Sequence, residues 1–116
     1  MRTRATRTPP PLADTIHELE PLDELAAIFA SLGSAPRLRL LFLLYHDPDR
    51  TVGELAGMLG ISVSGVSAHL RRLREAKLVS CRRDGQTVCC ALASGSRHIR
   101  ALRTMFREIT EETGCC

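Results

Sequence analysis

The chain has 116 residues, 44% of them hydrophobic, a formal net charge of +3 and five cysteines. A chain of this length has room for one small core and often relies on oligomerisation for further stability. We find no apolar run of about 18 residues, and the basic N-terminus lacks a hydrophobic segment. A membrane span, a membrane partner and a secretory signal are therefore not expected, and the predicted location is cytoplasmic.

The charges divide along the chain. Residues 12–61 contain eight acidic and three basic side chains, whereas residues 62–86 contain six basic and two acidic ones. A nucleic acid responds to local charge rather than to the total. The second of these segments is therefore the one that we expect to contact double-stranded DNA.

The first residues, 1–11, read MRTRATRTPPP, and we expect them to form a disordered basic arm. The predicted domain spans residues 12–114, and residues 115–116 form a cysteine tail. Within the domain, residues 12–20 are a short helical lead-in, and Pro21 suits the first position of a helix that covers 22–32. Ser34 caps the next helix, 35–45, which is apolar almost all round and should therefore be buried at the centre. Residues 46–50 form a loop.

Residues 52–59 and 62–76 read as two helices joined by a short turn that contains Gly60 and the capping residue Ser62. On a helical wheel, one side of the second helix is apolar. Its other side carries small residues first and arginines later, so that the helix can lie deep in a DNA groove while guanidinium groups reach phosphates or guanine edges. The polar side consists of Ser64, Ser67, Ala68, Arg71 and Arg72.

Two strands are predicted next, 78–83 and 86–92, joined at Asp84-Gly85, which is a strong hairpin signal. A basic hairpin directly after a recognition helix defines a winged helix-turn-helix, and its wing would follow the DNA backbone or minor groove. The fold class is therefore mainly α with a small β-hairpin. The predicted DNA contacts are Ser62, Ser64, Gly65, Ser67, Ala68, His69, Arg71, Arg72, Arg82, Arg83 and Gln86.

The last predicted helix starts after residues 94–96 and ends at Thr113. Because the domain already has a core without it, we expect this helix and residues 22–32 to form a homodimer interface. The alternative is that it packs on its own domain only. A dimer would present two recognition helices to half-sites one helical turn apart. The apolar stripe of this helix consists of Ile99, Leu102, Met105, Phe106 and Ile109.

Three segments together resemble the ArsR/SmtB family: 54–56, 61–79 and the wing residues 83–85. The resemblance extends over residues 22–112. It implies a dimeric winged-helix repressor of operator DNA, in a family of which many members sense metals. The chain departs from the family pattern at several positions. Lys77 replaces the usual glycine at a helix end, where a left-handed residue is often needed, and the remaining departures are Val63, Gly65, Ala68, Cys89 and Cys90.

The cysteines suggest a chemical signal. Structural disulfides are rare in cytosolic proteins, and neighbouring thiolates are good ligands for soft ions. With Asp84-Gly85 as the turn, Cys81 pairs opposite Val88 and lies diagonally from Cys90 on one face, while Cys89 points to the other face. A buried, purely structural role for these side chains is the alternative.

The resemblance also implies where a metal would bind. In the family, the last helices of two subunits pack antiparallel, and metal sites form there from both chains. His98 and Glu112 match ligand positions, but Ile109 replaces a second histidine, and the helix 52–59 lacks the family's Cys-x-Cys site. Antiparallel pairing would instead bring the tail cysteines close to the wing of the other subunit. We therefore expect an intersubunit thiolate site made of Cys89, Cys90, Cys115 and Cys116, with Cys81 as a further candidate.

The expected function is operator release when a thiophilic ion binds these thiolates. Arsenite or a related arsenical is favoured, mercury or cadmium comes next, and no organic cofactor is expected. Two alternatives stay open: a repressor switched by thiol oxidation or persulfide formation, and a regulator with no metal response. An enzyme is not expected, because the four histidines show no ligand or triad spacing. They are His17, His46, His69 and His98.

Overall fold

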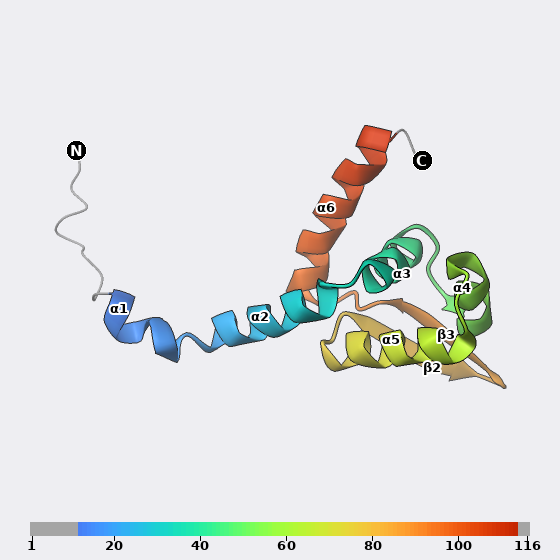
Figure 1. Cartoon of the computed structure of the whole chain (residues 1–116), viewed down its shortest axis with the longest axis horizontal. Coiled ribbons are helices and arrows are strands. Elements are labelled where there is room, and N and C mark those ends of the chain that lie inside the picture. The colour runs from blue at the N-terminus through green and yellow to red at the C-terminus, as the bar shows by residue number, and fades with distance from the viewer. Residues whose placement is uncertain (1–11, 114–116) are drawn as a thin grey trace.

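The structure, a computed structural model, describes residues 12–113. The predicted arm 1–11 and the cysteine tail 115–116 lie outside the described residues. Helices α2 and α6 project from a body that the middle of the chain forms (Figure 1). The elements are α1 (Leu12–Thr15), the 3-10 helix η2 (Ile16–Glu18), α2 (Glu20–Leu32), α3 (Ala35–His46), β1 (Arg50–Thr51), α4 (Val52–Leu59), α5 (Val63–Glu75), β2 (Val79–Asp84), β3 (Thr87–Leu92) and α6 (Arg97–Thr113).

Helix α3 occupies the centre of the body, as its composition predicts, but it is not buried all round. Leu40, Leu41 and Leu44 are at most 1% exposed, whereas Leu38 on another side is 37% exposed. The expectation of complete burial is therefore wrong for one face, because no element of the described chain covers it. The helix begins as predicted at Ser34, whose side chain accepts a hydrogen bond from the Arg37 backbone N–H.

The helix-turn-helix is confirmed. Helix α4 begins with a capping box, in which Glu54 N–H donates to Thr51 Oγ1 (3.1 Å) and Thr51 N–H donates to Glu54 Oε1 (3.0 Å). The box satisfies two backbone donors that the helix itself leaves free. Gly60 ends α4 in the left-handed conformation, with φ at 70°, which glycine adopts without steric cost. The chain can then turn sharply into α5.

The predicted hairpin is part of a three-stranded antiparallel sheet with the order β1-β3-β2. Strand β1 falls in the segment expected to be a loop; it pairs Arg50 with Cys90 and Thr51 with Cys89. A strand of two residues has too few positions to show an alternating pattern, so periodicity could not reveal it. It ties the start of α4 directly to the wing.

The register of the hairpin differs by one residue from the predicted one. Asp84 pairs with Thr87, so the two turn residues are Gly85 and Gln86, and Cys81 lies directly opposite Cys90 rather than diagonal to it. Gly85 has a φ of 67°, whereas Gln86 is not left-handed. A left-handed glycine in the first central position suits a type II′ turn, and the prediction had placed the glycine second, as in type I′.

Helix α6 contributes more to its own domain than expected. Ile99, Leu102 and Phe106 are at most 4% exposed and belong to the core, whereas Met105 and Ile109 are about half exposed, at 52% and 47%. The expectation that the core is complete without this helix is therefore wrong. Only one edge of the predicted apolar stripe is left for another molecule.

Within residues 12–113, no single helix is long and apolar enough to span a membrane. Helices α2 and α3 meet that test of length and composition only as a pair, with a 95° bend between them.

Candidate DNA interface and cysteine site

Helix α5 has one buried and one open side. Val66, Leu70 and Leu73 are at most 3% exposed and anchor the helix to the core. This anchoring fixes the rotation of the helix about its axis, so that its polar side points outward. The predicted DNA-contacting residues of α5 that lie exposed there are Ser64, Ser67, Ala68, Arg71 and Arg72.

The first turn of α5 is narrow and well capped. Gly65 N–H donates to Ser62 Oγ (3.0 Å), and the Ser62 and Ser64 hydroxyls lie 3.2 Å apart. A Cβ at position 65 would lie 3.2 Å from Ser62 Oγ, which is tighter than an ordinary contact. Glycine therefore leaves room for the cap, and the slim end of the helix can approach a DNA base edge closely. Gly65 itself is half-buried, as is His69 one turn later.

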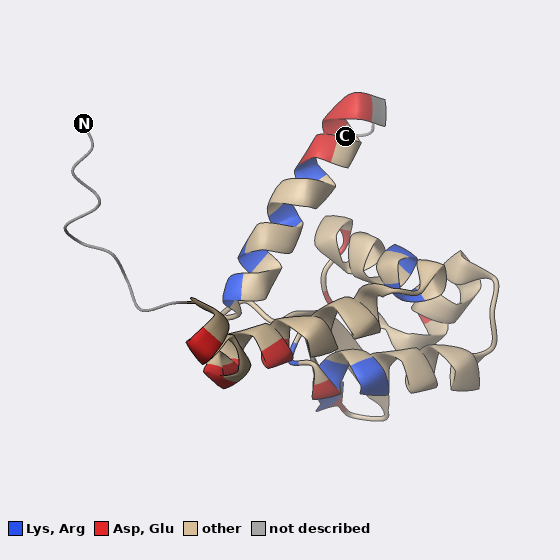
Figure 2. Cartoon of the chain, turned by 60° about the vertical axis from the view of Figure 1, so that its left-hand side comes forward, with Lys and Arg blue, Asp and Glu red and all other residues tan. Residues whose placement is uncertain are grey.

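The exposed side of α5 carries cations with no acidic partner. Arg71, Arg72 and Arg74 are exposed, and none of them forms an ion pair with another described residue. Acidic positions gather on the N-terminal elements and at the C-terminal end of α6, while basic positions follow the rest of α6 (Figure 2). Unpaired arginines of this kind bind phosphate by displacing counterions from DNA.

The wing places its predicted contacts at an exposed tip. Arg82, Arg83 and Gln86 are all exposed. Arg82 has a partner that sequence reasoning missed: its Nη1 lies 3.4 Å from Asp49 Oδ1, and both side chains are 60% exposed. Such an exposed ion pair contributes little to folding stability, so Arg82 can leave Asp49 and bind a DNA phosphate instead. Asp49 adopts a left-handed φ of 65°, and its N–H donates to Cys90 O (3.1 Å), which holds it beside the sheet.

The cysteines of the wing form one bonded pair and one free thiol. Cys81 and Cys90 are joined by a disulfide across β2 and β3, with their Cα atoms 4.1 Å apart. Cys90 is completely buried and Cys81 half-buried. Cys89 is free and half-buried; it pairs with Arg82 on one side and Thr51 on the other. In this structure Cys90 is therefore a disulfide sulfur rather than the thiolate that metal binding requires.

The predicted intersubunit metal site is only partly contained in the described residues. Cys115 and Cys116 lie outside the described residues. His98 Nε2 is 3.5 Å from Glu24 Oε2, so this histidine faces α2. Within the described part of the chain, no three His, Cys, Asp or Glu side chains lie close enough together to hold a metal ion.

A capped recognition helix with an exposed polar side, followed by a basic wing, defines a winged helix-turn-helix DNA-binding protein. Residues 35–80 match the family described as "Bacterial regulatory protein, arsR family". The chain is 39% identical to the nodulation protein NolR of Rhizobium meliloti, over 96% of this chain and 90% of that protein. It therefore belongs to the ArsR/SmtB family of transcriptional regulators, as its motifs predict, and the family confirms that it is not an enzyme.

Two further similarities bear on repression and assembly. The chain is 33% identical to a protein of Synechocystis named transcriptional repressor SmtB homolog, over 83% of this chain and 68% of that one. A solved structure of Mb0332 from Mycobacterium bovis, described as a homodimeric winged helix-turn-helix DNA-binding domain, superposes with a TM-score of 0.66. The two sequences are 27% identical, and the superposition covers 78% of this chain and 82% of the Mb0332 domain.

Proposed function

We propose that this protein is a homodimeric repressor that binds operator DNA through α5 and the wing and releases it when Cys81 and Cys90 are oxidised. The observation that carries this proposal is the disulfide between facing residues of β2 and β3. The bond lies in the same hairpin as Arg82 and Arg83, and Cys81 is the chain neighbour of Arg82. A change in strand geometry between the dithiol and the disulfide would therefore act directly on the neighbouring DNA-contacting residues Arg82 and Arg83.

The dimer is supported by apolar surface that the chain leaves uncovered. Leu22 and Phe29 on α2 are 45% and 59% exposed, and Met105 on α6 is 52% exposed. A small apolar groove lies between these two helices, beside the N-terminal half of α6. Adjacent exposed apolar side chains of this kind mark an interaction surface, and a self-complementary one suits a symmetric dimer. The homodimeric state of the similar Mb0332 domain agrees with this reading.

The redox step is chemically complete with a peroxide as oxidant. The peroxide oxidises one thiolate to a sulfenic acid and is itself reduced to water or an alcohol; the second thiol then attacks that sulfur and expels water, which leaves the disulfide. Because the cytosol keeps thiols reduced, the dithiol is the expected resting form and the disulfide the signalled one. Two free thiols need more space than a bonded pair, so the two forms hold β2 and β3 differently. A difference of this kind lets oxidation change DNA affinity.

Binding of a thiophilic ion is a second candidate, and the same juxtaposition favours it. Once reduced, Cys81 and Cys90 present two sulfurs on facing positions, with Cys89 next in the chain. Because Cys89 points to the other face of the sheet, the facing pair offers two thiolates, which suit mercury, and trivalent arsenic would need a third sulfur from elsewhere. The intersubunit arrangement, in which Cys115 and Cys116 of one subunit approach Cys89 and Cys90 of the other, stays part of this candidate.

The two candidates can be separated with a DNA duplex that the reduced protein selects in vitro from a random pool. Fluorescence anisotropy would measure its binding to reduced protein, to peroxide-treated protein and to reduced protein with arsenite. We expect peroxide to weaken binding at least tenfold in the wild type and in the matched control Cys89→Ser. It should leave the double variant Cys81→Ala/Cys90→Ala unchanged.

Other outcomes would decide against redox control. Release by arsenite but not by peroxide, lost in Cys89→Ser, would support the thiolate metal site instead. Unchanged binding under every treatment would leave a repressor with no thiol signal. Equal sensitivity of the double variant and the wild type to peroxide would remove Cys81 and Cys90 from the mechanism.

A further inference from the structure

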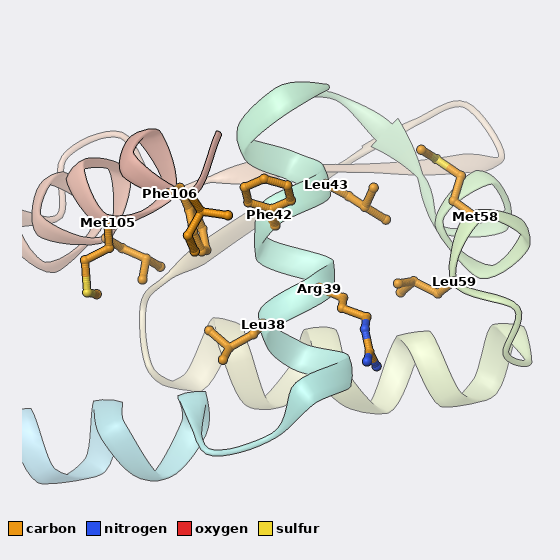
Figure 3. A pocket seen from close by; sticks show the side chains of 10 residues that line it. Leu38, Arg39, Phe42, Leu43, Met58, Leu59, Met105 and Phe106 are labelled. Carbon is orange, nitrogen blue, oxygen red and sulfur yellow. The ribbon is translucent and has the colours of Figure 1, made fainter. Parts of the chain in front are cut away.

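A second, larger pocket lies on the open side of α3. It has a volume of about 530 Å³, and its lining comes from α3, α4 and α6. Figure 3 shows the lining on both sides of α3, with Met105 and Phe106 of α6 on one side and Met58 and Leu59 of α4 on the other. The volume falls within the range of about 300–1,000 Å³ that is typical of small-molecule sites. The face of α3 that composition predicted to be buried is thus the wall of a cavity.

One charged residue belongs to this otherwise apolar lining. Arg39 projects from the side of α3 that faces Leu59, and its guanidinium points away from Phe42 and Leu43 (Figure 3). It is exposed, and it forms neither an ion pair nor a side-chain hydrogen bond within residues 12–113. The nearby Arg37, in contrast, donates from Nε to the Ser31 carbonyl. Arg39 is therefore a cation without a protein partner beside an apolar cavity.

This combination selects a particular ligand chemistry. An apolar wall favours an aliphatic or aromatic body, and an unpaired guanidinium offers parallel N–H donors that match a carboxylate. A sugar or nucleotide would lose hydrogen bonds to water and find few polar groups in the pocket to replace them. An organic cation would be repelled by Arg39. We propose that the pocket binds a small amphipathic carboxylic acid, such as a medium-chain fatty acid. Its carboxylate pairs with Arg39, and its chain lies between α3 and α6 against Phe42 and Phe106.

The position of the pocket favours a small ligand over the second subunit. Phe29, the most exposed apolar residue of α2, lines the groove beside the N-terminal half of α6. The pocket shares Leu102 and Met105 with that groove, but it continues along α6 to Phe106 and Ile109 and reaches across α3 to Met58 on α4. A helix–helix contact along α2 and the start of α6 would cover Met105 but would leave the part of the pocket between α3 and α4 uncovered.

Binding can be measured on the full-length, reduced dimer with decanoate as the probe, by isothermal titration calorimetry below micelle-forming concentrations. Decanol and decyltrimethylammonium keep the chain and change the head group. We expect decanoate to bind best, and each methylene added between octanoate and decanoate to raise the affinity about fourfold. Arg39→Gln should weaken decanoate about tenfold and leave decanol unchanged, because it removes one charge-assisted pair.

Two variants give the structural controls. Arg100→Gln removes the same charge from an exposed position outside the pocket and should bind decanoate like the wild type. Met58→Trp should fill the cavity and abolish binding, while circular dichroism reports an intact fold. Equal affinities for decanoate and decyltrimethylammonium, or equal losses in Arg39→Gln and Arg100→Gln, would overturn the assignment. So would absence of binding to the dimer; amide exchange at α3 that slows as the monomer associates would then identify the second subunit as the occupant.

Discussion

At the scale of single residues, Lys77 is the position most at odds with its backbone. It follows α5 with a φ of 61°, in the left-handed region. Its N–H donates to Arg74 O, and Leu78 N–H donates to Leu73 O, each at 2.9 Å. These two bonds form a Schellman motif, whose left-handed position glycine normally occupies. The prediction that a left-handed residue is needed here is confirmed, and in this chain that residue is a lysine instead of a glycine.

Replacing Lys77 with glycine should stabilise the protein. The left-handed conformation costs an L-residue about 1–2 kcal/mol, and the extra flexibility of unfolded glycine offsets part of that gain. We expect the free energy of unfolding in urea to rise by about 0.5–1 kcal/mol. Lys77→Ala, which removes the side chain but keeps the strain, should not share the gain. A Gly variant no more stable than the Ala variant would contradict this account of Lys77.

Arg71 should matter for DNA binding far more than for stability. It is exposed on the polar side of α5 and has no ion pair among the described residues. Arg71→Ala should weaken binding to the selected duplex by about 1–3 kcal/mol if it reads a base, with little change in unfolding. Anisotropy titration against Arg100→Ala, an equal change of charge on α6, provides the comparison. Equal affinities of the two variants would place Arg71 away from DNA.

At the scale of elements, local chemistry made most of the fold predictable. The two helices of the DNA-binding motif, the cap at Ser62 and the wing all follow from periodicity and turn residues. Strand β1 and the hairpin register could not be predicted in the same way. Both depend on which partner a strand meets and on which of two turn types Gly85 supports, and a one-residue slip changes every cross-strand pair. The disulfide between Cys81 and Cys90 depends on that register.

Substitutions at the cap of α5 should affect folding stability and DNA affinity differently. Ser62 accepts from Gly65 N–H, so Ser62→Ala should lower the free energy of unfolding by about 1 kcal/mol. Ser62→Asp should keep the cap, and its charge suits a helix N-terminus. The same charge should repel phosphate, so this variant should unfold like the wild type and bind the duplex at least tenfold more weakly. Wild-type affinity for Ser62→Asp would show that the start of α5 does not approach DNA.

At the scale of the whole molecule, the sequence could not predict which apolar residues of α6 are buried in the core and which stay exposed. Helical periodicity groups all five apolar residues into one stripe, but three of them complete the core and Met105 and Ile109 do not. Which apolar positions are covered depends on how the helix packs, which a wheel cannot show. The projecting α2 and α6 leave apolar surface that the proposed dimer would cover (Figure 1).

The dimer can be tested at Phe29, which is 59% exposed on α2 and lines the groove against α6. Phe29→Asp should shift the protein to monomer in sedimentation velocity, because association would bury an unpaired charge. The fold of the monomer should persist, since the side chain already contacts water. Phe29→Leu keeps the apolar surface and should stay dimeric. A dimeric Phe29→Asp protein would place the interface elsewhere.

The most direct test of the whole account is the DNA sequence that the reduced protein selects from a random duplex pool. Two α5 helices related by a two-fold axis should select an inverted repeat, with half-site centres about 10 base pairs, or a multiple of one helical turn, apart. Arg71→Ala should relax the preference within each half-site and keep the spacing. A single unrepeated motif, or a pool that stays random after selection, would contradict the central claim that a symmetric pair of recognition helices reads the operator.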